Sequence, residues 1–214
     1  MGASAIARLK GARLAGASAA VAAALMFGAL AWSVASGAAD PVDTAVRATI
    51  HEGASDTTTQ LAFLFSFLGS APVWLSVSVA AGAVFWRLDW QRAAIDLVIV
   101  MTGAIALENA LKLAFARARP EVYFGAAPPT FSFPSGHAFF AACLYGALAC
   151  LIADRIGQPM RRVALWCAAM LLAGAIGWSR IYLGVHHPSD VVAGYVAAVC
   201  WIGFVTAVRA SNEK

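Results

Sequence analysis

The residues with the clearest capacity for chemistry gather in three short stretches of the chain. They are Lys112 and Arg119 in the first stretch, Ser135, Gly136 and His137 in the second, and Arg180, His186 and Asp190 in the third. Arginine matches phosphate oxygens as a planar fork, and lysine neutralises them as a compact charge. Because phosphoryl transfer depends mainly on positioning and electrostatics, these residue types together predict a site for a phosphate ester.

The second stretch, Phe133-Pro134-Ser135-Gly136-His137, predicts the start of a helix. Proline is tolerated in a first helical turn, and serine is a favoured N-terminal capping residue. The free N–H groups of such a turn, together with the helix dipole, favour an anion. His137 could then donate a proton to the group held there.

The third stretch supplies a nucleophile. His186 and Asp190 are four residues apart, so the carboxylate can accept a hydrogen bond from Nδ1 of the imidazole, either in a helix or in a turn. That bond would fix the tautomer and make Nε2 the better nucleophile. In this scheme His137 protonates the leaving oxygen.

Hydropathy places these stretches at a membrane. The 214 residues are 61% hydrophobic and 12% charged, with a mean hydropathy of +0.75, which is far more apolar than an ordinary soluble domain. Since one span needs about 20 apolar residues, the length allows about six spans. We predict an all-α, polytopic membrane helical bundle, a single membrane-embedded domain over residues 1–214, with spans near 14–36, 61–86, 93–115, 135–152, 163–178 and 190–208.

The N-terminal part leaves one alternative open. The second span is interrupted at Gly69-Ser70-Ala71-Pro72, so residues 57–70 form either an interfacial helix or part of a kinked span. Residues 40–60 are polar and predict an external loop in which His51 is solvated. The basic start resembles a signal peptide, but the apolar run after it is too long for one, and a retained first helix is predicted.

The distribution of the 15 basic residues predicts the orientation. With both termini in the cytoplasm, the inner side of the plasma membrane holds Arg8, Lys10, Arg13, Arg87, Arg92, Arg155, Arg161, Arg162, Arg209 and Lys214. The outer side, which is periplasmic or extracellular, holds Arg47, Lys112, Arg117, Arg119 and Arg180. All of these outer cations except Arg47 flank the predicted pocket, where an anionic substrate needs them.

Other ionisable residues receive less specific predictions. Arg117 lies between the two cations of the first stretch; a contact with phosphate or a lipid headgroup is conceivable, but a solvated cation is preferred. Glu108 precedes Lys112 by one helical turn and could pair with it in a structural role. Asp96 is predicted to be interfacial and solvated. The four cysteines lie in apolar runs without metal-ligand spacing, so neither a disulfide nor a metal site is predicted, and no basic run suggests nucleic acid.

Three motifs resemble, in order, the signatures of the type 2 phosphatidic acid phosphatase superfamily. They are Lys112-x6-Arg119-Pro120, Pro134-Ser135-Gly136-His137 and Ser179-Arg180-x5-His186-x3-Asp190, all within residues 112–190. The resemblance implies a helical bundle whose site needs neither metal nor cofactor. It assigns phosphate binding to Lys112, Arg119, Ser135, Gly136 and Arg180, acid catalysis to His137, a phosphohistidine intermediate to His186, and its support to Asp190. The spacing of the third motif selects His186 over the adjacent His187.

The spans and the resemblance together predict an integral membrane lipid phosphatase. Undecaprenyl diphosphate is the preferred substrate, with phosphatidylglycerophosphate, phosphatidate and lipid A phosphate as close alternatives. Aromatic residues near the outer surface are predicted as interfacial anchors that also suit a lipid tail entering sideways: Tyr123, Phe124, Phe131, Phe133, Trp178 and Tyr182. The distant alternatives are a vanadate-dependent haloperoxidase, whose known members are soluble, and a non-catalytic lipid transporter. The sequence does not predict the oligomeric state.

Overall fold

The computed structural model describes residues 3–212, and within this range every regular element is an α-helix. The helices are α1 (Ala3–Ala35), α2 (Asp40–Glu52), α3 (Asp56–Leu68), α4 (Ala71–Arg87), α5 (Gln91–Phe115), α6 (Gly136–Ala153), α7 (Pro159–Tyr182) and α8 (Pro188–Asn212). Five of them, α1, α5, α6, α7 and α8, are long and apolar enough to cross a membrane. The helices α3 and α4 meet the same criteria only as a pair, so the prediction of an all-α bundle with about six spans is confirmed.

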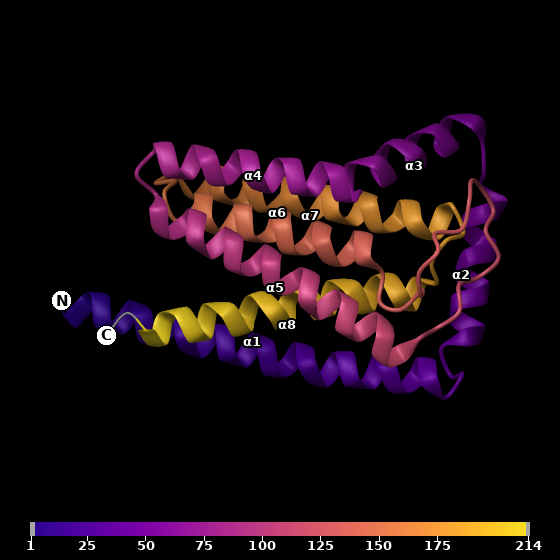
Figure 1. The fold of residues 1–214 in the computed structure, drawn as a ribbon, viewed down its shortest axis with the longest axis horizontal. Coiled ribbons are helices and arrows are strands. Elements are labelled where there is room, and N and C mark those ends of the chain that lie inside the picture. Colours follow the sequence, from indigo (N-terminus) through magenta and orange to yellow (C-terminus); the bar gives the residue numbers. More distant parts are fainter. Residues whose placement is uncertain (1–2, 213–214) are drawn as a thin grey trace.

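The two ends of the bundle have different contents (Figure 1). The α4–α5 and α6–α7 turns lie at the end where α1 starts and α8 finishes. The opposite end carries the long connection between α5 and α6, the α7–α8 turn and α2, which lies across the ends of the other helices. The three motif stretches therefore meet at the end away from the termini. Of the predicted inner cations, Arg8, Lys10 and Lys214 lie outside the described side chains.

The interrupted second span is a bent helix pair. The helices α3 and α4 meet at Gly69-Ser70 with an angle of 49° between them. A Cβ on Gly69 would lie 2.4 Å from the Ile176 side chain and 3.1 Å from the His137 ring, so only glycine lets the bend approach α6 and α7 this closely. The bend therefore brings α3 against the motif residues of two other helices.

The prediction of an external loop over residues 40–60 is wrong, because this segment is mostly helical. Pro41 at the start of α2 and acidic residues in its first turn favour a helix N-terminus. Ser55 then caps α3 and forms a reciprocal pair of bonds with Thr58. His51 is not freely solvated either, since its ring stacks on Tyr123 at 3.9 Å.

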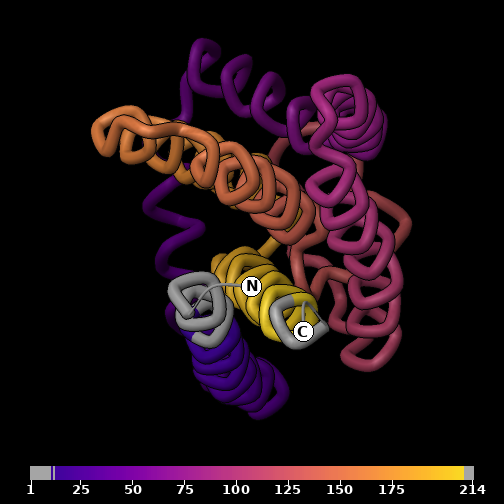
Figure 2. Tube along the Cα trace, turned by 90° about the vertical axis from the view of Figure 1, so that its left-hand side faces the viewer, coloured from indigo at the N-terminus to yellow at the C-terminus, as the bar shows by residue number. Residues whose placement is uncertain are grey.

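Close backbone packing joins the first and last helices. Figure 2 shows α1 at the edge of the bundle, with α8 between it and the other helices. A Cβ on Gly16 would lie 2.8 Å from the Gly203 carbonyl oxygen, and a Cβ on Gly203 would lie 2.7 Å from that of Gly16. Small residues at such a crossing allow the close van der Waals contact that holds membrane helices together.

The core between α5, α6 and α8 positions the helices that carry the motifs. Leu97, Phe139 and Leu144 are buried there. The Trp201 indole donates to the Val100 carbonyl at 2.9 Å, which fixes α8 against α5. Two of the aromatic residues predicted to be interfacial, Phe133 and Tyr182, are buried instead.

Candidate active site

A cavity of about 230 Å³ lies where the motif stretches meet. Its lining includes six of the residues predicted for the site: Lys112, Arg119, Gly136, His137, Arg180 and His186. They come from α5, the α5–α6 connection, α6, α7 and the α7–α8 turn. The fold thus brings together residues that are up to 74 positions apart in the sequence, as the difference between 186 and 112 shows.

The remaining two predicted residues, Ser135 and Asp190, lie directly behind the cavity lining and are fully buried. Ser135 is the N-terminal capping residue of α6, but its side chain makes no capping bond, and its Oγ has no hydrogen-bond partner among the described residues. The predicted side-chain cap is therefore wrong, and Pro134 precedes the helix rather than lying in its first turn. A buried hydroxyl without a partner at a helix N-terminus can serve an anion.

Arg119 binds the loop before α6 and also reaches His186. Its Nε and Nη2 donate to the Thr130 carbonyl and hydroxyl at 2.8 and 2.9 Å, and its Nη1 donates to the Val185 carbonyl at 2.7 Å. Nη1 also lies 3.1 Å from Nε2 of His186. The guanidinium is thereby held in one orientation by neutral acceptors, so its positive charge is not cancelled.

Lys112 has one charged partner. Its Nζ lies 3.3 Å from the Glu108 carboxylate, which confirms the predicted pair, and donates to the Phe131 carbonyl at 2.9 Å. Glu108 also lines the cavity and leaves no room for a side chain at Gly136, where a Cβ would lie 2.6 Å from Oε1. Three cations and one carboxylate therefore face the cavity, and the excess charge is positive.

His186 is buried between the cavity and Asp190. Its Nδ1 lies 3.4 Å from Oδ2 of Asp190, the contact that the spacing predicts. Since arginine can only donate, the contact with Arg119 makes Nε2 the acceptor and leaves the proton on Nδ1. Burial lowers the pKa of His186 to about 4; Asp190 acts in the opposite direction, while Arg119 and Arg180 reinforce the lowering. The imidazole is thus neutral near pH 7, with the Nε2 lone pair on the cavity side.

Asp190 is held from four directions. Oδ2 accepts bonds from the Ser132 hydroxyl and, at 2.9 Å, from the backbone N–H of His187. Oδ1 accepts a bond of 2.7 Å from Arg117. Behind this carboxylate lies a second one, Asp43 of α2, which is also buried. We call the group Asp43, Arg117, Ser132, Ser189 and Asp190 the rear network, and the cations Lys112, Arg119 and Arg180 the pocket wall.

The prediction of a solvated Arg117 is wrong. Its side chain is 12% exposed, and its Nη2 lies 3.0 Å from Asp43. It does not line the cavity, so it is not placed for the alternative role of phosphate contact either. The sequence gave no sign of its two acidic partners, because Asp43 lies 74 residues earlier in a segment interpreted as a loop.

Ser66, in α3, contacts two motif residues. Its hydroxyl accepts a hydrogen bond from Nη1 of Arg180, and its backbone carbonyl accepts one from the His137 ring. The Nε of Arg180 is buried and has no hydrogen-bond partner among the described residues, which leaves a donor on the pocket wall for a ligand. Ser66 escaped the sequence prediction because it lies outside every motif, one turn before the bend at Gly69.

Two further predicted positions can be compared with the structure. The ring of His187 lies 3.9 Å from Asp43 rather than at the cavity, which agrees with the choice of His186. Asp96 is not simply solvated, because it forms an ion pair of 2.6 Å with Arg209 between α5 and α8. That ion pair lies at the end of the bundle away from the cavity, so it plays no part in the candidate site.

A family profile agrees with this geometry. The profile of the PAP2 superfamily matches residues 93–214, which contain all three motifs. The chain belongs to the PAP2 superfamily. Its relatives include phosphatidylglycerophosphatase B of Bacillus subtilis, which is 33% identical over 123 residues, or 56% of this chain and 59% of that protein. An undecaprenyl-diphosphatase of Sulfolobus acidocaldarius is 32% identical over 152 residues, or 68% of each chain.

A solved PAP2 structure extends the similarity to the whole bundle. The crystal structure of a transmembrane PAP2-type phosphatidylglycerolphosphate phosphatase from Bacillus subtilis matches with a TM-score of 0.81 and 26% identity, over 91% of this chain and 97% of that one. Together with the apolar helices, this match identifies the PAP2 chain as a multi-pass membrane protein. In sequence, the chain spans about three fifths of the length of several curated relatives that it matches.

Proposed function

We propose that this PAP2 protein is a lipid phosphatase that removes phosphate from a lipid headgroup through a phosphohistidine intermediate. The observation that carries the proposal is the position of His186, whose Nε2 lone pair faces a cavity lined by three cations and His137. An attacking nitrogen, a proton donor and positive charge are the components that phosphoryl transfer needs.

The proposed reaction has two steps. Nε2 of His186 attacks phosphorus, the bond to the lipid oxygen breaks, and His137 gives its proton to that oxygen. Water then attacks the phosphohistidine, the nitrogen–phosphorus bond breaks, and His137 takes up the proton from the water, so inorganic phosphate leaves. Lys112, Arg119 and Arg180 neutralise the phosphoryl oxygens in both steps, Ser135 and the Gly136 N–H donate to them, and Asp190 stabilises the charged imidazole.

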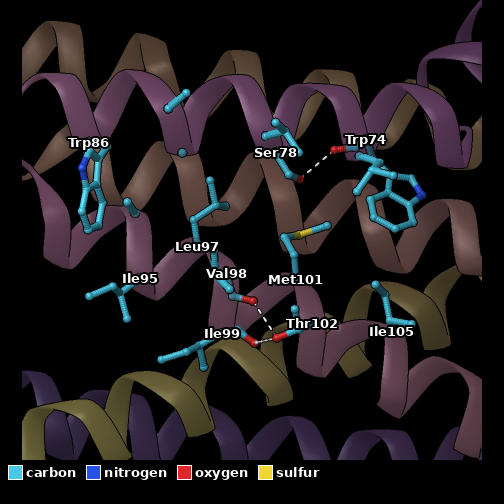
Figure 3. Close-up of a pocket in the computed structure, with 15 residues that line it drawn as sticks. Trp74, Ser78, Trp86, Ile95, Leu97, Val98, Ile99, Met101, Thr102 and Ile105 are labelled. Carbon is cyan, nitrogen blue, oxygen red and sulfur yellow. Dashed lines mark hydrogen bonds between the residues drawn. The ribbon is translucent and has the colours of Figure 1, made fainter.

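An apolar groove beside the cavity supports a lipid substrate. The groove has a volume of about 580 Å³, lies between α4 and α5, and shares Trp74 with the catalytic cavity (Figure 3). Its two hydroxyl side chains, Ser78 and Thr102, donate to carbonyls of their own helices and leave the surface apolar. A hydrocarbon chain can therefore lie in the groove while its headgroup reaches His186.

The relatives narrow the choice of headgroup. The match to the Bacillus subtilis structure covers nearly the whole chain and favours phosphatidylglycerophosphate. The similarity to the Sulfolobus acidocaldarius protein favours undecaprenyl diphosphate, from which the same step would release undecaprenyl phosphate. On the basis of the inner basic residues, we place the site on the outer face of the plasma membrane.

Phosphate release from purified protein tests the proposal. The panel contains phosphatidylglycerophosphate, undecaprenyl diphosphate, phosphatidate and lipid A phosphate, each with EDTA present. We expect turnover of at least one lipid in EDTA, and an acid-quenched ³²P-protein adduct that His186→Ala abolishes. His187→Ala is the matched control, because its ring faces Asp43 rather than the cavity. Turnover that survives in His186→Ala would contradict the mechanism.

A further inference from the structure

Arg117 joins two buried carboxylates that come from different parts of the chain. Nη1 donates to Oδ1 of Asp190 at 2.7 Å and to the Ser189 hydroxyl at 2.8 Å. Nη2 donates to Oδ2 of Asp43 at 3.0 Å. The side chains of Asp43 and Asp190 are 2% and 0% exposed. A buried carboxylate is costly without a cation, so this guanidinium holds both in their ionised form.

Asp43 also fixes the first turn of α8. Its Oδ1 accepts from the Ser189 backbone N–H at 2.8 Å, and its Oδ2 accepts from the Ser189 hydroxyl at 2.6 Å. Ser189 is adjacent to Asp190, so α2 holds the turn that carries the carboxylate. Any displacement of α2 would therefore be transmitted to the position of Asp190.

We propose that Arg117 and Asp43 are positioning residues for catalysis, acting on His186 through Asp190. The inference rests on the proposed function, which assigns the attack to Nε2 of His186. Arg117 orients the free oxygen of Asp190 while the other oxygen faces Nδ1, so the carboxylate keeps the angle that fixes the imidazole tautomer. The candidate catalytic apparatus thus extends beyond the three motifs to α2.

The charge-retaining variant Arg117→Lys tests this role. One ammonium is a point charge and cannot bridge both carboxylates as a planar fork does. We expect kcat to fall by about 10-fold, and by roughly 30-fold or more in Arg117→Gln, with KM and the inhibition constant of orthovanadate within about 2-fold of wild type. Asp43→Asn should lower kcat in the same way. If Arg117→Gln does not fold, Arg117→Lys and Asp43→Asn carry the test.

A double-mutant cycle separates positioning from a general structural role. In an Asp190→Asn background Arg117 has nothing left to position, so adding Arg117→Lys should change kcat by less than about 2-fold. Arg47→Gln is the matched control, because Arg47 ties α2 to the carbonyls of Glu121 and Gly184 without touching Asp190. It should keep kcat within about 3-fold of wild type, with no dependence on the Asp190 background.

Three outcomes would overturn the inference. They are an unchanged kcat in Arg117→Lys, an equal loss of kcat in both Asp190 backgrounds, and a rise in KM with kcat unchanged, which would make Arg117 a substrate contact. Wild-type turnover is measured first on the same lipid panel. Its absence would sink the proposed function, whereas turnover without the predicted coupling would sink the positioning role alone.

Discussion

The pocket wall and the rear network lie on opposite sides of one imidazole and satisfy their charges differently. On the cavity side, Arg119 is bound by neutral oxygens and Arg180 by the hydroxyl of Ser66. On the other side, Arg117 meets the carboxylates of Asp43 and Asp190. Neutral acceptors orient a cation without cancelling it, whereas carboxylates cancel it. The pocket wall therefore retains charge for an anion, and the rear network keeps its geometry.

The largest expected effect comes from breaking the rear network at Asp190. Asp190→Asn removes the charge that stabilises the imidazolium and permits the wrong tautomer of His186, so we expect kcat to fall by about 10³- to 10⁴-fold. Steady-state phosphate release measures the loss. Asp96→Asn is the matched control, because it breaks an ion pair at the opposite end of the bundle. An Asp190→Asn variant with near wild-type kcat would show that the rear network does not serve His186.

A change in the pocket wall should affect binding as well as rate. Arg119→Lys keeps the charge but loses the fork that spans Thr130 and Val185, so we expect kcat/KM to fall by about 100-fold. KM and the inhibition constant of orthovanadate should both rise. Arg117→Lys is the natural comparison, since it should lower kcat alone. If the two lysine variants gave the same division between kcat and KM, the distinction between the two sides would fail.

The pH dependence should move in opposite directions when the two sides are perturbed. Burial lowers the pKa of His186 to about 4, so kcat/KM of the wild type should fall below that pH, by about 10-fold per pH unit. Asp190 raises this pKa and Arg119 lowers it. Asp190→Asn should therefore move the acid limb to lower pH, and Arg119→Gln should move it to higher pH.

The other charged groups facing His186 are Arg180 and His137, and they stay unchanged in both variants. The ionisation of the substrate is also common to all three proteins, so the differences between profiles report His186. Acid limbs that move in the same direction in both variants would contradict the assignment. The profiles are best recorded as kcat/KM, which reports the free enzyme.

The smallest expected effect comes from the bend between α3 and α4. Ser66→Ala removes the hydroxyl that holds Arg180, so we expect KM to rise by about 3- to 10-fold with a smaller change in kcat. Ser70→Ala is the matched control, because the Ser70 hydroxyl lies at the same bend without a hydrogen-bond partner among the described residues. Equal effects of the two variants would mean that the bend, and not the bond to Arg180, sets affinity.

The sequence predicts the pocket wall better than the rear network. Apolar runs locate the long helices, and the charged ends of those runs locate Lys112, Arg180 and Asp190. Arg117 could not be assigned, because its role depends on Asp43, and nothing in a polar stretch shows which carboxylate will be buried. Ser66 was missed for a related reason. Its role comes from a bend that brings α3 against Arg180, which is 114 residues away.

The close contact of Gly16 with Gly203 has a consequence for biosynthesis. The ribosome delivers α1 before the other described helices and α8 after them, so α1 waits in the bilayer for its main partner. Asp190 lies in the first turn of α8 and takes its place only when that helix docks. Until then His186 lacks its carboxylate, and the incomplete chain is catalytically silent however many earlier helices are in place.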